Sequence, residues 1–145
     1  MSNLKIDFKF FIVGKEKNMD FYKEYAKKLN ISDKVIFTGP RVDVDKFYSM
    51  ADIFLFPTHY EPFGSVIIEA LNFECVAFTT KRCGAGEILP KDWIIDEKIV
   101  EKIEFLLNNE EELEKLKQLA KQISKNFSIE KNVAKTLKVI NETFN

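Results

Sequence analysis

The sequence is poor in the residue types on which metal, redox and polyanion chemistry depend. Its 145 residues include two cysteines, one histidine and one tryptophan, and 22 basic against 23 acidic residues give a formal net charge of −1. The cysteines, Cys75 and Cys83, have neither metal-binding nor redox-motif spacing, so both are predicted to be reduced thiols. The near-neutral charge gives no electrostatic support for a nucleic-acid partner.

Long apolar segments are also missing. No run of residues approaches the length of a transmembrane helix, and residues 1–7 contain no apolar core of the kind found in signal peptides. The cytoplasm is therefore the expected compartment, with peripheral contact at the inner face of a membrane left open. A content of 46% hydrophobic and 31% charged residues is ordinary for a folded domain, and the length suits one domain spanning residues 1–145.

What the sequence does contain is a regular alternation of short apolar runs and longer amphipathic stretches. The predicted strands are residues 8–13, 35–38, 52–56 and 76–80, with 93–95 as an edge strand. Helices are predicted between them at 19–30, 44–50 and 66–73, and after them at 99–107, 113–123 and 129–144. Strands alternating with helices at this spacing predict βαβ units. The expected fold class is therefore α/β, a Rossmann-like three-layer domain with a parallel sheet and C-terminal helices.

The most informative stretch, Pro57–Leu71, has the sequence PTHYEPFGSVIIEAL. It combines the end of an apolar strand, a turn rich in proline, glycine and serine, and the start of an apolar helix. Such a junction leaves backbone N–H groups free at the carboxyl edge of a sheet, where open α/β folds bind anionic ligands.

Two carboxylates, Glu61 and Glu69, bracket this turn with seven residues between them. If the helix begins near Ser65, Glu69 lies about 6 Å along its axis, and Glu61 stays in the loop on the other side of the helix start. A ligand with phosphates at the helix start could then offer hydroxyl groups to both acids. A nucleotide diphosphate sugar has this layout, since its pyrophosphate lies between a ribose and a second sugar.

The segment EPFGSVIIEAL, at 61–71, closely resembles the Glu-x7-Glu signature of retaining glycosyltransferases of family 4. Three further segments resemble the family in the same order: FFIVG at 10–14, KVIFTG at 34–39 and MADIFLFP at 50–57. The resemblance covers residues 8–107 and implies the donor-binding half of a GT-B enzyme, which is built from two Rossmann-like domains. The N-terminal, acceptor-binding domain of such an enzyme is then expected to be absent from these 145 residues.

The resemblance also implies roles for the residues around the turn. Glu61 would contact the donor sugar and stabilise positive charge at its anomeric carbon, and Glu69 would hold the two ribose hydroxyls. The backbone N–H groups of Phe63, Gly64 and Ser65 would bind the pyrophosphate or the sugar. The plainer interpretations are that Glu61 is a turn residue favoured by the helix dipole and that Glu69 is a helix-surface glutamate.

Two further donor contacts follow from the resemblance. Gly14 ends the first strand, where the family's chain passes close to the phosphates. Arg41 follows the second strand and is placed to touch the base, although an exposed loop arginine is an equal alternative. The family usually holds the pyrophosphate with an Arg and a Lys upstream, and residues 1–7 contain only Lys5. The chain alone is therefore expected to bind donor weakly and to transfer nothing.

The segment TTKRCG, at 79–84, resembles the corresponding loop of enzymes that add glucose to lipopolysaccharide core. This favours UDP-glucose as donor and a growing lipopolysaccharide, capsular or other surface glycan as acceptor, reached through the other domain. No cofactor and no metal are expected, because the helix dipole and basic residues can replace a cation. Two alternatives stay open: a non-catalytic nucleotide-binding or interaction module, and a GT-B sugar-nucleotide epimerase. Covalent attack by Glu61 and stabilisation of an oxocarbenium-like state stay open as well.

Overall fold

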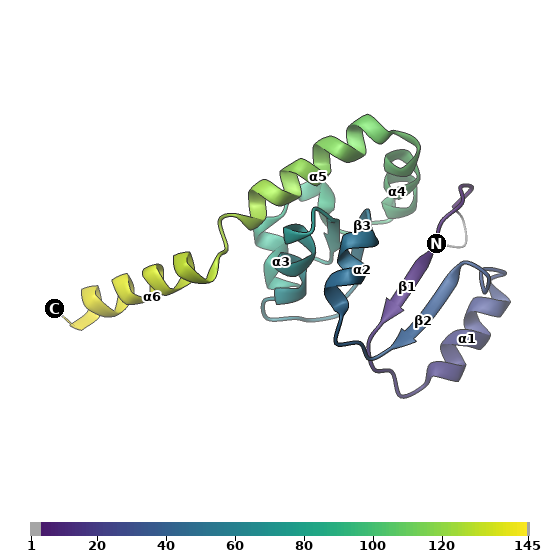
Figure 1. Ribbon diagram of the computed structural model, residues 1–145, viewed down its shortest axis with the longest axis horizontal. Helices are drawn as coiled ribbons and strands as arrows, with labels where there is room; N and C mark the ends of the chain where they lie inside the picture. The colour runs from purple at the N-terminus through teal and green to yellow at the C-terminus, as the bar shows by residue number, and fades with distance from the viewer. Residues whose placement is uncertain (1–3, 145) are drawn as a thin grey trace.

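The computed structural model describes residues 4–144 as an α/β domain from which one helix extends (Figure 1). Strands and helices alternate in the order β1 (Phe10–Val13), α1 (Met19–Lys28), β2 (Val35–Gly39), α2 (Val44–Met50), β3 (Ile53–Phe56), α3 (Ser65–Asn72) and β4 (Val76–Thr79). Two 3₁₀ turns, η1 (Gly84–Ile88) and η2 (Lys91–Trp93), lead to α4 (Ile99–Asn108), α5 (Glu110–Ser124) and α6 (Ile129–Phe144). The predicted α/β class and the order of its elements are confirmed.

The strands form two parallel pairs, β1 with β2 and β3 with β4. In the first pair Phe10 N–H donates to the carbonyl of Lys34 (2.7 Å), so the next residue, Phe11, directs its backbone groups away from β2. In the second pair Val76 N–H donates to Asp52 (2.9 Å), and Ile53 directs its groups away from β4. Among residues 4–144 no strand pairs with the edge of β1 that faces away from β2, or with the edge of β3 that faces away from β4. The parallel arrangement was predicted correctly. The prediction of one sheet is corrected, because the four strands form two separate parallel pairs.

Helix α2 ties the two pairs together on one face. Phe47 meets Phe11 of β1 edge to face, with 5.7 Å between the ring centroids. The neighbouring Tyr48 meets Phe54 of β3 in the same way at 5.5 Å. Aromatic pairs of this geometry contribute about 0.5–1.5 kcal/mol beyond the area they bury. Consecutive residues of one helix therefore fix β1 relative to β3.

The hydrophobic core lies around β4. Every residue of Val76–Thr79 is buried, and α3 packs against this strand with Ile67 and Leu71, which have no exposed surface. Phe78 of β4 contacts Trp93, with 6.4 Å between the ring centroids. Helices α4 and α5 close the core with Ile103, Leu106 and Ala120. Helix α3 therefore stands on the most tightly packed part of the domain.

The predicted edge strand at 93–95 is reduced to a single bridge. The 3₁₀ turn η2 ends at Trp93, and Ile94 pairs with Thr79 of β4. Ile95 N–H donates to the Thr79 carbonyl (2.7 Å). Because Lys91–Trp93 form this turn, they are not available for a longer strand. Among the residues described, β4 therefore pairs on this edge only through the bridge between Thr79 and Ile94.

Helix α6 was predicted at 129–144, and it leaves the body of the domain (Figure 1). Val133, Leu137 and Ile140 recur on it at helical spacing and are 51%, 54% and 46% exposed. Its apolar stripe therefore meets solvent in this chain, whereas α5 packs on α3 and β4. In the part of the chain that the structure describes, no helix is long and apolar enough to cross a bilayer.

Candidate functional site

The loop between β3 and α3 ends at Gly64, which has a backbone conformation that favours glycine. Its φ angle is 86°, in the left-handed region, and it directly precedes α3. A Cβ atom at this position would lie 2.8 Å from Cys83 Sγ and 3.3 Å from Glu61 Cγ. Both conformation and space therefore require glycine here, and the Glu61 side chain lies against the start of α3.

The start of α3 carries no side-chain cap. The Ile67 N–H group donates to the Gly64 carbonyl (2.9 Å), while the first N–H groups of a helix have no acceptor within it. Glu61 Oε1 accepts a hydrogen bond from Phe63 N–H (3.4 Å), so this carboxylate lies at the helix entry. The partial positive charge of the helix N-terminus favours a negatively charged ligand at the same place.

A second loop, which follows β4 and includes the start of η1 (residues 80–85), holds the first one in position. Glu61 N–H donates to the Arg82 carbonyl (3.1 Å), and Gly84 N–H donates to the Glu61 carbonyl (3.0 Å). Ala85 N–H donates to the Phe63 carbonyl (2.6 Å). Three backbone hydrogen bonds thus join residues about 20 positions apart in the sequence. They fix the backbone of Glu61 relative to β4 and the core.

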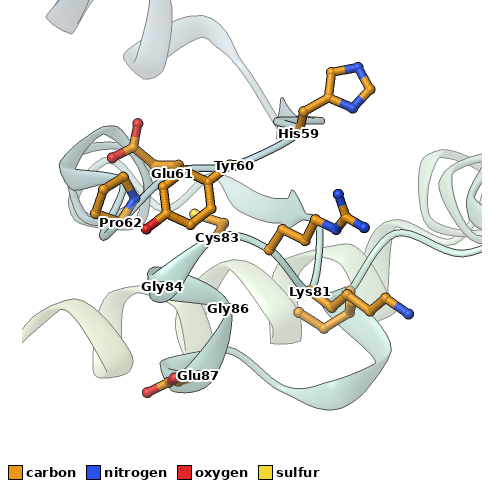
Figure 2. A pocket seen from close by; sticks show the side chains of 11 residues that line it. His59, Tyr60, Glu61, Pro62, Lys81, Cys83, Gly84, Gly86 and Glu87 are labelled. Atoms are coloured by element: carbon orange, nitrogen blue, oxygen red, sulfur yellow. The ribbon is translucent and has the colours of Figure 1, made fainter.

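The two loops enclose an open pocket of about 650 Å³ (Figure 2). Its acidic residues are Glu61 from the first loop and Glu87 from η1, and its basic residues are Lys81 and Arg82. In Figure 2 the Lys81 side chain points away from Glu61, and the His59 ring points outward from the loop. Glu61 therefore lines an open pocket that is formed by the two loops, η1 and Ile94.

Glu69 lies four residues into α3 beyond Ser65, so these two residues share one exposed face of the helix. Its Oε2 atom accepts a hydrogen bond from the hydroxyl of Tyr48 on α2, at 3.3 Å. Burial, together with the negative charge of Glu69, raises the pKa of Tyr48 to about 12. Glu61 thus contacts the second loop and Glu69 contacts α2, and the two acids flank the start of α3.

Gly14, at the end of β1, lies on an open surface. Its φ angle is 140°, and a Cβ atom built there would have no atom within 4 Å among the residues described. Gly14 N–H donates to the Gly39 carbonyl at the end of β2 (3.0 Å). The space beside Gly14 is open, but its N–H group is already donated to Gly39, so a phosphate could accept from this N–H only by sharing or replacing that hydrogen bond. The phosphate contact of Gly14 stays a prediction.

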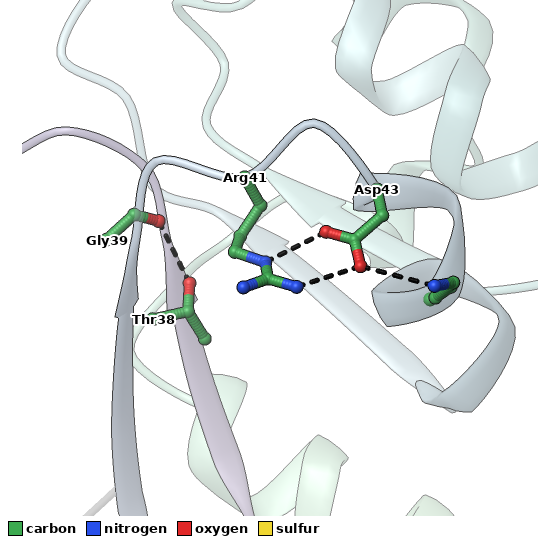
Figure 3. Close-up of polar contacts among 5 residues, drawn as sticks. Thr38, Gly39, Arg41 and Asp43 are labelled. Atoms are coloured by element: carbon green, nitrogen blue, oxygen red, sulfur yellow. Dashed lines mark hydrogen bonds and ion pairs between the residues drawn. The ribbon is translucent and has the colours of Figure 1, made fainter.

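Arg41 is engaged with an acid of its own loop (Figure 3). Its Nε and a terminal nitrogen donate to Oδ1 and Oδ2 of Asp43, each at 2.8 Å, and Lys46 Nζ lies 3.4 Å from Oδ2. The hydrogen bonds from Arg41 hold the pKa of the Asp43 carboxyl below its ordinary value. A nucleotide base would have to share or break this two-point contact, so base recognition by Arg41 also stays a prediction.

Residues 1–123 match the family described as glycosyl transferases, group 1. The chain belongs to this family. The match includes both loops and the whole of α3, so the stretch that carried the sequence resemblance lies inside it. The predicted kinship with glycosyltransferases is confirmed.

Curated relatives of this group 1 chain are much longer proteins. An uncharacterised glycosyltransferase of Methanocaldococcus jannaschii is 31% identical over 145 residues, which cover 94% of this chain and 41% of that protein. The lipopolysaccharide glucosyltransferase WaaG of Escherichia coli is 35% identical over 74 residues, or 51% of this chain and 20% of that protein. The chain spans less than half the length of either relative.

A solved structure of similar fold is that of HepE from Anabaena in complex with UDP. It superposes with a TM-score of 0.81 at 21% identity, covering 95% of this chain and 43% of that one. The described part of the chain therefore has the fold found in one half of a GT-B glycosyltransferase.

Three contributors to the site were not predicted from the sequence. The second loop was noted for the resemblance of residues 79–84 to a glucosyltransferase loop, yet Lys81 and Glu87 were not named as lining the site. Cys83 was expected to be a reduced thiol, and nothing in the sequence pattern indicated that its sulfur atom lies next to Gly64. Tyr48 lies 21 positions from Glu69, and nothing in the sequence pattern indicated their contact.

Metal binding was not expected for this chain. Residues 4–144 contain no group of three histidine, cysteine or acidic side chains placed to hold a metal ion. Metal-independent transfer stays an expectation.

Proposed function

We propose that this chain is the donor-binding domain of a retaining glycosyltransferase that moves a hexose from a nucleotide diphosphate sugar to a growing surface glycan. The observation that carries the proposal is the start of α3, which has no side-chain cap and is flanked by Glu61 and Glu69. UDP-glucose is the first donor to test, because the HepE structure contains UDP and WaaG is a lipopolysaccharide glucosyltransferase. Lipopolysaccharide and capsular glycans are the candidate products.

In the proposed reaction the bond between the anomeric carbon and the pyrophosphate breaks, and a glycosidic bond forms, with retention, to an acceptor oxygen whose hydroxyl proton passes to the leaving nucleoside diphosphate. The leaving pyrophosphate gains negative charge, which the N-terminus of α3 stabilises. Glu61 stabilises the positive charge on the sugar ring. Glu69 binds the ribose hydroxyls and so places the pyrophosphate between the two acids.

The remaining parts of the reaction belong to the longer enzyme. The acceptor site and the basic residues that neutralise the pyrophosphate are assigned to polypeptide outside this chain, which spans less than half of its relatives. This chain by itself is therefore expected to bind the donor weakly and to transfer no sugar.

A nucleotide panel tests donor binding directly. UDP-, GDP- and ADP-glucose are titrated against the wild-type chain, Glu69→Ala and, as a matched control, Glu97→Ala, which removes an exposed glutamate just before α4. A nucleotide at ten times its Kd stabilises a folded protein by about 1.4 kcal/mol, which thermal unfolding detects. We expect one nucleotide to stabilise the wild type and the control, and Glu69→Ala to lose most of that gain. No stabilisation by any nucleotide contradicts the proposal.

A further inference from the structure

The side chain of Tyr48 lies along α3 and is held by two aromatic rings. It stacks on Phe73, with 5.8 Å between the centroids and an interplanar angle of 25°, and meets Phe54 edge to face at 77°. Phe73 directly follows α3, and Glu69 lies four residues earlier, one helical turn away on the same face. The ring of Tyr48 therefore rests at the end of α3 while its hydroxyl reaches Glu69.

The backbone of Tyr48 is fixed as well. The buried thiol of Cys75 donates to the Tyr48 carbonyl (3.2 Å) and lies 3.4 Å from the Ala51 carbonyl. Cys75 directly precedes β4, so the end of α2 is anchored to the core. Because both the backbone and the ring of Tyr48 are held, its side chain has little conformational freedom, and its hydroxyl group has a defined position.

The Tyr48 hydroxyl is a hydrogen-bond donor throughout the neutral range, because its pKa of about 12 keeps it protonated. It donates to Oε2 of Glu69, at 3.3 Å. A carboxylate has acceptor sites for about four hydrogen bonds on its two oxygens. The other acceptor sites of Glu69 therefore remain available to a ligand on the exposed face of α3.

We propose that Tyr48 is a positioning residue that holds the Glu69 carboxylate ready for the two neighbouring hydroxyls of a ribose. A glutamate side chain on a helix surface otherwise samples several rotamers, and binding must select one of them. Tyr48 makes that selection before the ligand arrives. The inference rests on the proposed function, since it assigns a purpose to Tyr48 only if Glu69 binds the nucleotide.

The test uses UDP and 2′,3′-dideoxy-UDP, which lacks both ribose hydroxyls. Their affinities are measured by calorimetry for the wild-type chain, Tyr48→Phe, Glu69→Ala and the double variant. Tyr25→Phe on α1, which removes the hydroxyl of an exposed tyrosine, is the matched control. We expect Tyr48→Phe to weaken UDP binding about three- to tenfold, as for loss of one hydrogen bond to a charged group, and to leave dideoxy-UDP unchanged.

The double variant separates positioning from packing. If Tyr48 acts through Glu69, Tyr48→Phe causes no further loss in the Glu69→Ala background, which leaves the Tyr48 hydroxyl no acceptor at position 69. An equal loss for both nucleotides, or the same loss in both backgrounds, overturns the inference. If Glu69→Ala weakens UDP binding and Tyr48→Phe does not, only the inference fails. If neither variant changes it, or the wild type binds none of UDP, GDP and ADP, the proposed role of Glu69 fails with it.

A measurement without ligand checks the contact itself. The pKa of Tyr48 is raised by burial and further raised by the charge of Glu69 and the hydrogen bond to it. Replacing the carboxylate by an amide removes the charge, so the pKa of Tyr48 in Glu69→Gln is expected to fall. Nuclear magnetic resonance of tyrosines labelled at the ring carbon follows this titration, with Tyr48→Phe identifying the signal. An unchanged pKa overturns the inference.

Discussion

Gly84 packs directly against the backbone of Pro62, so that any side chain at Gly84 would collide with the Pro62 carbonyl group. The contact joins the loop after β4 to the loop before α3, at the point where Gly84 N–H donates to the Glu61 carbonyl. The atom that would be struck belongs to the main chain, which cannot move aside as a flexible side chain can. The position of Glu61 therefore depends on the absence of one Cβ atom in another loop.

This contact predicts that Gly84→Ala separates the two loops. The expected cost is roughly 1–3 kcal/mol of unfolding free energy, or more if the backbone cannot shift, accompanied by loss of nucleotide binding. Gly86→Ala is the matched control. Its Cβ atom would lie 3.2 Å from the mobile end of Ile94 and 3.3 Å from the Thr80 carbonyl, so a smaller cost of about 1 kcal/mol is expected. Urea unfolding of both variants gives the comparison, and equal costs would contradict this account.

Glu61→Gln tests whether the charge at the pocket is catalytic. The amide oxygen of glutamine can still accept the hydrogen bond from Phe63 N–H, so the loop and the nucleotide affinity should be kept to within about threefold. Transfer by the complete enzyme should fall by roughly a hundredfold or more, because the charge that stabilises the sugar in the transition state is gone. Glu97→Gln, at an exposed position before α4, serves as the control.

The same experiment discriminates between the alternative functions. Undiminished transfer by Glu61→Gln would refute a catalytic role for this carboxylate. Binding of a nucleotide sugar without transfer by the complete wild-type protein favours a non-catalytic module. A labelled donor that returns as its epimer, with no glycoside formed, favours a sugar-nucleotide epimerase.

The Arg41–Asp43 contact predicts a pH-dependent contribution to stability. Because Arg41 lowers the pKa of Asp43 in the folded chain, the contribution is complete above the unfolded pKa of an aspartate, about 3.9, and is lost as the pH falls through the lower folded value. Arg41→Ala should therefore lower the melting temperature at pH 7 and make little difference near pH 2. Melting curves at both pH values check the sign. A difference of equal size at both pH values would show that Arg41 acts through packing alone.

Much of the fold was predictable because it is encoded locally. Apolar runs and helical periodicity located β1 to β4 and all three intervening helices. The glycine before α3 was expected to be a turn residue, and its left-handed backbone agrees with that. The two-residue spacing of Arg41 and Asp43 also carried the information needed to expect their ion pair, although the sequence was not interpreted in that way. The periodicity of a strand does not reveal its neighbours, so the division into two parallel pairs was not foreseen.

The sequence by itself determined where the chain turns from β3 into α3, which glycine stands there, and that an acid lies on each side. These features depend on the conformational limits of single residues and on spacing along one helix. Only the tertiary structure decided that Tyr48 reaches Glu69 and that Gly84 supports the loop of Glu61. Those contacts join segments 20 or more positions apart, and they form because the packing of α2, α3 and β4 around one core brings them together.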